Sequence, residues 1–136
     1  MLGIIIITLI ILLVFVGVVK YVGSRVLFVE QIAMDVIVLE NGRKLGFNVD
    51  TDAVHFGSIV RGGTGKREII VTNELSDDVR VKLSSLEELG SWVSFEKNDF
   101  ILEAGTNMSV MSYVQVPIRA NLRQHNGTVS IVYKKI

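Results

Sequence analysis

The sequence predicts an antiparallel β-sandwich preceded by one N-terminal transmembrane α-helix. Residues 2–19 form an apolar run without a charged side chain, although the whole chain carries 14 basic and 14 acidic residues. The remaining residues form short β-branched or alternating segments, with turn residues at intervals of roughly 8–12 positions. No internal segment has a convincing helical period. We therefore expect a transmembrane helix over residues 1–22 and one β-sandwich domain over residues 23–136.

The N-terminal run is long enough to cross a membrane. It reads LGIIIITLIILLVFVGVV, and at about 1.5 Å per residue it spans roughly 27 Å, close to the thickness of a bilayer core. In lipid a helix forms even from β-branched residues, because it satisfies its own backbone hydrogen bonds. Lys20 and Tyr21 follow where a cation and an interfacial aromatic belong. The side chains expected in the hydrocarbon include Leu2, Ile5, Leu9, Leu12, Val16 and Val19.

Three other interpretations of this segment fit less well. A cleaved signal peptide has a basic start and a shorter apolar stretch. A buried core helix is shorter and has a polar stripe. A pilin-like helix resembles this one in position and hydrophobicity, but type IV pilins carry an acidic residue near the start of the mature helix and a preceding basic-Gly processing site. We favour a membrane anchor and keep the filament subunit as the alternative.

The strands of the domain are predicted from composition, alternation and turn residues. Residues 36–38 are β-branched and precede an Asn41-Gly42 turn pair. Val79, Val81 and Leu83 alternate with basic residues, as in a half-buried strand. Pro117 cannot donate to a sheet ladder and ends a long strand. The expected extended segments are 32–39, 45–49, 53–60, 68–73, 79–83, 92–96, 100–102, 108–116 and 129–133, with a polar loop over 118–126 in which 118–124 could form one helical turn.

Several motifs, in their order and spacing, resemble the ASH/MSP-like (PapD-like) immunoglobulin sandwiches. They are Phe56-Gly57, Gly62, the segments 69–73 and 79–83, Phe100-Ile101-Leu102 before Ala104-Gly105, the strand ending at Pro117, and Gly127. The resemblance covers roughly residues 53–136 and implies an immunoglobulin-like sandwich used for protein contacts. Residues 46–52 are similar to a stretch in small membrane-anchored archaeal proteins of unknown role. Archaellum stator subunits are similar in plan, an anchor plus an outward β-sandwich.

Two patterns give opposite predictions for orientation in the membrane. Lys20 and Arg25 follow the helix, so the positive-inside rule favours a cytoplasmic domain. Asn107 and Asn126 begin the sequences NMS and NGT, which match the N-glycosylation acceptor and favour the outside. With the plan of the similar proteins added, we expect a single-pass protein of the cell membrane with its β-domain outside the cytoplasm.

The composition excludes several classes of function. Basic and acidic residues balance, so no net charge attracts nucleic acid. Cysteine is absent, which removes disulfides and thiolate metal sites. We expect no nucleic-acid partner, no metal and no cofactor, whereas membrane lipid is an expected partner through the helix.

Two short motifs suggest ligand loops but lack required residues. Residues 62–66 read GGTGK, yet Val60 stands where a P-loop has its first Gly and Arg67 where it has Ser or Thr, so we predict a turn. Asn48, Asp50 and Asp52 alternate like calcium ligands. An EF-hand needs a Gly and a later Glu that are missing here, so we predict solvated turn residues and keep a calcium site between loops as the alternative.

Catalytic constellations are not visible in the sequence. His55 and His125 are the only histidines, and no ligand spacing supports a metal site on them. His55 lies between apolar neighbours, so it is predicted to point outward from a strand. Three serines (Ser84, Ser85 and Ser91) lack a nucleophile-elbow context, and the adjacent Glu87 and Glu88 do not converge as catalytic carboxylates do. We expect no enzymatic activity.

Trp92 is the single tryptophan, expected in the core, with an interface anchor as the alternative. Met108 and Met111 fall on opposite faces of a strand and form no shared apolar stripe. The sequence therefore predicts a non-enzymatic, membrane-anchored module of the cell envelope. It would contact a protein partner of unknown identity or self-associate. The alternative is a pilin-like or archaellum-associated filament subunit whose helix packs in the filament core.

Overall fold

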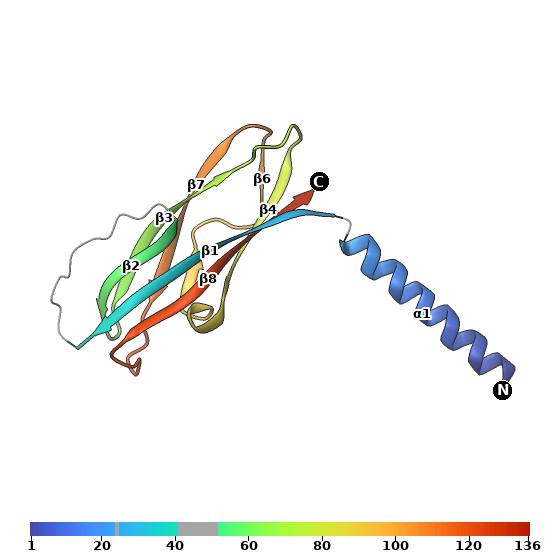
Figure 1. Ribbon diagram of the computed structural model, residues 1–136, viewed down its shortest axis with the longest axis horizontal. Helices are drawn as coiled ribbons and strands as arrows, with labels where there is room; N and C mark the ends of the chain where they lie inside the picture. The colour runs from blue at the N-terminus through green and yellow to red at the C-terminus, as the bar shows by residue number, and fades with distance from the viewer. Residues whose placement is uncertain (24, 41–51) are drawn as a thin grey trace.

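The computed structural model describes residues 1–23, 25–40 and 52–136 (Figure 1). One helix precedes a domain made mainly of strands, as predicted. The elements are α1 (Leu2–Gly23), β1 (Val26–Leu39), β2 (Ala53–Val60), β3 (Thr64–Thr72), β4 (Val79–Leu86), a short 3₁₀ helix (Glu87–Leu89), β5 (Val93–Phe95), β6 (Phe100–Leu102), β7 (Asn107–Gln115) and β8 (Gln124–Lys135).

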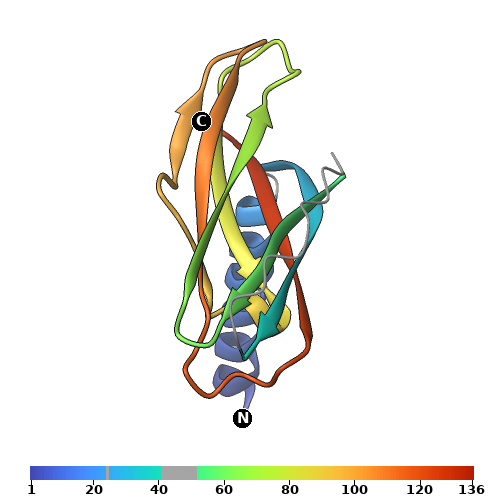
Figure 2. The same cartoon turned by 90° about the vertical axis from the view of Figure 1, so that its left-hand side faces the viewer.

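The strands form two sheets. The larger has the order β2-β1-β8-β4-β6 and the smaller the order β3-β7-β5. Figure 2 shows β7 and β8 in separate layers. The strand pairs are antiparallel except β1 and β2, which are parallel, so the prediction of a purely antiparallel arrangement is wrong at this edge. A parallel pair needs a long connection, and residues 40–52 provide one.

Both sheets contribute side chains to one hydrophobic core. Along β4, Val79, Val81 and Leu83 are buried while Arg80 and Lys82 are exposed, which confirms the predicted two-residue alternation. The largest fully buried side chains are Tyr133, Met34, Leu83, Leu89 and Ile131. Apolar burial of this kind is the main stabilising contribution to folding.

The packing is tight where the 3₁₀ helix covers β8. A Cβ atom built on Gly127 would lie 2.8 Å from Leu89 Cβ and 2.8 Å from Met34 Cε. Only glycine therefore fits this point of β8 without displacing the core. The requirement explains a glycine in a strand interior, where its missing side chain would otherwise weaken the strand.

Some of the extended segments predicted from the sequence match the strands of the structure closely, and others differ in their bounds. Segments 53–60 and 100–102 match β2 and β6, whereas β1 begins six residues earlier than the predicted segment 32–39. The polar loop predicted over 118–126 is wrong at its end, because residues 124–126 belong to β8 and pair with β1. Residues 118–119 form a single turn, closed by the N–H of Ala120 donating to the carbonyl of Pro117 at 3.1 Å. The segment predicted at 45–49 lies outside the described residues.

Helix α1 lies apart from both sheets (Figure 1). The part from Leu2 to Tyr21 is long and apolar enough to cross a membrane, and none of it is buried against the domain. The hydroxyl of Thr8 is satisfied within the helix, since Thr8 Oγ1 donates to the carbonyl of Ile4 at 2.8 Å. The six side chains predicted to face hydrocarbon are all exposed: Leu2, Ile5, Leu9, Leu12, Val16 and Val19.

Candidate functional site

Trp92, the predicted core or interface residue, lies just before β5 and is half-buried. Its side chain packs against the hydrophobic core, and its ring centroid is 4.6 Å from that of His125. Its backbone ties two segments together, because its N–H donates to the carbonyl of Leu89 at 3.0 Å and its carbonyl accepts from the N–H of Gln115 at 2.8 Å. A partner contact at Trp92 stays a prediction.

Both glycosylation acceptors are exposed and lie in paired strands, but they differ in their position along the strand. Asn107 is the first residue of β7, directly after a turn, and is exposed. Asn126 is also exposed but lies within β8, opposite Asp35 of β1, and its side-chain oxygen accepts from Gln124 Nε2 at 3.2 Å. Because acceptor sites favour surface loops, Asn107 is the better candidate.

A polar cluster that the sequence did not predict surrounds His125. This histidine is 2% exposed, although its neighbours in the chain are polar. Its Nδ1 lies 2.6 Å from Glu88 Oε1, and its Nε2 lies 2.8 Å from the carbonyl oxygen of Asn121. Arg123 Nη2 donates to the same Glu88 oxygen at 2.5 Å. The hydrogen bond from Arg123, followed by that from His125, lowers the pKa of the Glu88 carboxyl below its ordinary value.

The geometry of this cluster indicates that it stabilises the fold by joining separate segments. Both ring nitrogens of His125 face oxygen acceptors, so neither presents a lone pair to an external proton donor. The cluster connects the 3₁₀ helix, which carries Glu88, to β8 and to the segment before it. It could be found from sequence only by pairing residues 37 positions apart.

His55 is half-buried and faces away from the core, as predicted, but it is not isolated. Its Nδ1 lies 2.7 Å from Asp35 Oδ2, on the neighbouring strand β1, where the two residues are opposite each other. Its carbonyl accepts from Arg67 Nε at 2.7 Å. Within the described parts of the chain, no three His, Asp or Glu side chains could together hold a metal ion.

The remaining motifs have local structural roles. Residues after β2 form a turn in which Gly62 has a φ of 73°, and strand β3 follows, which confirms the predicted turn in place of a phosphate loop. Ser85 Oγ donates to the carbonyl of Gly90 at 2.7 Å, so it closes the turn after β4. Asn48 and Asp50, considered as calcium ligands, lie outside the described residues.

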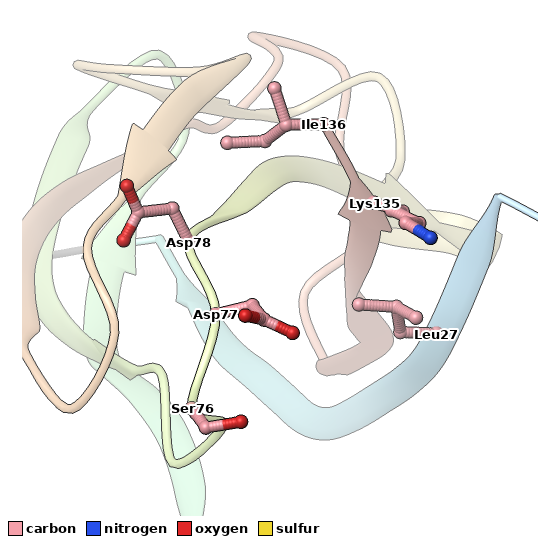
Figure 3. A pocket seen from close by; sticks show the side chains of 6 residues that line it. All are labelled: Leu27, Ser76, Asp77, Asp78, Lys135 and Ile136. Carbon is pink, nitrogen blue, oxygen red and sulfur yellow. The ribbon is translucent and has the colours of Figure 1, made fainter.

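Two hollows lie at the end of β8, and Lys135 and Ile136 line both of them. The first has a volume of about 580 Å³ and is lined by Leu27, Ser76, Asp77, Asp78, Lys135 and Ile136. Figure 3 shows Ser76, Asp77 and Asp78 on one side and Leu27 and Lys135 on the other. Asp78 Oδ1 accepts from the N–H of Ala104 at 2.9 Å, which holds the loop before β4 in place. A structural role therefore accounts for this carboxylate.

The second hollow, which we call the basic pocket, has a volume of about 450 Å³ and the opposite charge. It is lined by Tyr21, Arg25, Val26, Arg80, Lys82, Asp99, Lys134, Lys135 and Ile136. Its lining thus contains five basic side chains and one acidic side chain. Arg80 stands opposite Lys134 across β4 and β8, and Lys134 stands opposite Val26 of β1. The sequence did not predict this pocket, because its residues come from four separate segments.

Contacts at the end of α1 connect the helix to the basic pocket. Arg25 Nη2 donates to the hydroxyl of Tyr21 at 2.6 Å, and the Arg25 guanidinium lies 5.0 Å from the centre of the Tyr21 ring. The carbonyl of Arg25 accepts from the N–H of Lys135 at 2.7 Å. These contacts place the basic pocket immediately beside the end of the apolar helix.

Comparison with known proteins provides no further assignment for these sites: no family model, no curated protein and no solved structure matches the chain.

Proposed function

We propose that the protein is a non-enzymatic, single-pass membrane protein of the cell envelope whose immunoglobulin-like β-sandwich contacts other proteins. The observation that carries this proposal is the exposure of α1 along its whole apolar length. Soluble proteins rarely expose a contiguous apolar surface beyond a few hundred Å². A bilayer covers such a surface without any further contact from the chain.

The order of the strands supports an immunoglobulin-like sandwich. In that fold one sheet has the order A-B-E-D and the other contains G-F-C. Strands β3-β7-β5 correspond to B-E-D, and β4 and β8 correspond to C and F, with the same antiparallel pairings and the same order along the chain. Strand β1 lies beside β8, in the place of G. The strand that follows the membrane helix would thus take the place of the last strand.

Two features support protein contact over catalysis. Both ring nitrogens of the buried His125 contact oxygen atoms of the fold, which is a structural role. Strand β3 pairs only with β7 among the described strands, and it carries the exposed Ile70. A partner could add a strand at such an edge, with main-chain hydrogen bonds providing affinity.

Protease digestion of intact cells tests location and orientation together. With the domain outside the cytoplasm, added protease removes the β-domain and leaves a membrane-protected fragment that contains α1. An attached glycan at Asn107, abolished by Asn107→Gln, would support the same orientation. Full protection in intact cells, with digestion in permeabilised cells, would place the domain in the cytoplasm and contradict this part of the proposal.

The second candidate is a filament subunit, which the same exposed helix favours if copies of α1 cover one another. Mild detergent separates the candidates. A membrane-anchored module gives small monodisperse particles after extraction, whereas a filament subunit gives sheared fibres built from this chain. Fibres would overturn the anchor as the primary role of α1.

A further inference from the structure

The basic pocket concentrates charge in a chain that has none overall. The chain has 14 basic and 14 acidic residues, yet the pocket lining holds five basic side chains against Asp99 alone. Asp99 lies 3.4 Å from Arg80 Nε and leaves the other four basic side chains uncompensated by acidic side chains of the lining. Such a concentration of one sign in a concave surface attracts a counter-ion.

The register of the sheet places two basic side chains of the pocket opposite each other, which destabilises the fold when no anion is bound. Arg80 and Lys134 stand directly opposite each other on neighbouring strands. Like charges in that position are destabilising. An anion held between them would offset the repulsion, and guanidinium and ammonium groups are the side chains that bind phosphate oxygens most strongly.

We propose that the basic pocket binds the phosphate of an anionic lipid headgroup from the membrane that holds α1. This inference rests on the proposed membrane anchor. The chain passes from Tyr21 to Val26 in five residues, a reach of at most about 17 Å, and Val26 lies beside Lys134. The headgroup layer begins where the apolar part of α1 ends, so the pocket lies within reach of the lipid phosphates.

The contacts of Arg25 favour a lipid over a free anion. Arg25 donates to Tyr21, an aromatic residue at the end of the apolar helix, and its backbone accepts from Lys135 of β8. These contacts hold the pocket at the level where interfacial aromatic residues meet headgroups. Basic segments at this depth bind anionic lipids, and each basic residue strengthens the interaction roughly fivefold.

The test uses the full-length chain in two separate measurements. Flotation with vesicles of neutral phosphatidylcholine measures the anchor alone. Native mass spectrometry, after reconstitution in nanodiscs with equal amounts of phosphatidylcholine and phosphatidylglycerol, measures which lipid is retained. We expect flotation with neutral vesicles, and retention of phosphatidylglycerol over phosphatidylcholine by about tenfold or more.

A matched pair of variants assigns the retention to the pocket. The triple variant Arg80→Gln/Lys82→Gln/Lys134→Gln removes three of the five basic side chains of the pocket and should lose most of the preference for phosphatidylglycerol. The control Lys66→Gln/Lys97→Gln/Arg119→Gln removes the same charge from exposed positions outside the pocket and should keep the selectivity. All six side chains are accessible to solvent, so both variants should fold, which a thermal melt verifies.

Three results would overturn the inference, and a fourth would overturn the anchor. Equal retention of both lipids by the natural chain would show that the basic pocket does not select an anionic lipid. Equal loss of lipid selectivity in both triple variants would assign the selectivity to the general charge of the domain and not to the basic pocket. Displacement of the retained lipid by millimolar inorganic phosphate assigns the pocket to a soluble anion. Failure to float with neutral vesicles contradicts the membrane anchor, irrespective of lipid selectivity.

Discussion

Helix α1 and strand β8 have similar apolar side chains in opposite environments. In β8, Val129, Ile131 and Tyr133 are completely buried, whereas in α1 even the most covered of the six predicted membrane-facing residues, Val16, is 45% exposed. The strand finds its partners within the chain, in β1, β4 and the facing sheet. Within the described residues, the apolar side chains of residues 2–19 of the helix stay exposed. Similar apolar side chains are therefore covered by the fold in one region and left exposed by it in the other.

The difference implies that the two regions are stabilised independently. Burial of a Val, Leu or Ile side chain contributes about 1.5–3 kcal/mol, and β8 obtains this contribution when the domain folds. The described residues of the domain do not bury the apolar part of α1, and lipid or other copies of the helix could supply the same contribution. Substitutions in one region should therefore leave the property of the other unchanged.

The largest effect is expected from charges in α1. The double variant Leu9→Asp/Leu12→Asp should disfavour membrane insertion by about 6 kcal/mol, because an aspartate at the centre of a bilayer helix costs roughly 3 kcal/mol relative to leucine. The measurement is the fraction of the chain that resists alkaline carbonate extraction, which should fall close to zero. As control, Ile70→Asp/Ile101→Asp places the same charges on exposed strand positions and should leave that fraction unchanged. If Leu9→Asp/Leu12→Asp stayed in the membrane fraction, this result would contradict the membrane anchor.

A smaller effect is expected from truncation in the core. Ile131→Ala should lower the free energy of unfolding of the domain by about 2–5 kcal/mol, because it removes buried methylene groups and leaves a cavity. Denaturant unfolding in detergent, followed by the fluorescence of the single tryptophan, Trp92, measures the change. Ile6→Ala removes the same atoms from the exposed helix and should not alter the unfolding midpoint. A matching loss in both variants would show that α1 packs on the domain.

The local sequence pattern predicted both the apolar helix α1 and buried strands of the domain such as β4. The charge-free run predicted α1, and the alternation of Val79, Val81 and Leu83 predicted which face of β4 is buried. These features depend on residues within a few positions of each other, so periodicity is sufficient to identify them. The fold class is coarsely predictable for the same reason.

Partners distant in the chain could not be predicted. His125 lies in a polar stretch and is buried only because Glu88 and Asn121 satisfy its two nitrogens. The parallel pairing of β1 with β2 depends on a connection whose course the sequence does not specify. The basic pocket forms when Arg80 and Lys134 become neighbours across two strands. In each case the determinant is a contact between residues far apart in the chain, which periodicity within a short window does not report.

Substitution of one glycine in β8 and one in α1 tests how tightly each region is packed. Gly127→Ala should destabilise the domain by about 1–3 kcal/mol, because the added Cβ would meet Leu89 and Met34 at 2.8 Å. Gly17→Ala should have no effect on membrane retention, since no atom lies within 4 Å of its added Cβ. Thermal unfolding measures the first change and carbonate extraction the second. A loss of assembled particles in Gly17→Ala would favour the filament alternative, where small residues allow close helix contact.

The smallest effect is expected at the Glu88 cluster, and it depends on pH. Arg123 and His125 lower the pKa of Glu88 in the folded domain below its ordinary value of 4.5. A lowered folded-state pKa means that the unfolded chain takes up the proton first as the pH falls, so the carboxylate stabilises the fold above pH 4.5. This stabilisation is lost as the pH falls below 4.5 through the folded-state pKa.

The variant Glu88→Gln should accordingly lower the midpoint of thermal unfolding at neutral pH, and the difference from the natural chain should shrink steadily below pH 4.5. Glu103→Gln, an exposed substitution before β7 that removes the same charge, is the matched control. If the difference between Glu88→Gln and the natural chain were independent of pH, the carboxylate charge would not be the stabilising feature. The cluster would then act through packing of His125 against Trp92 alone.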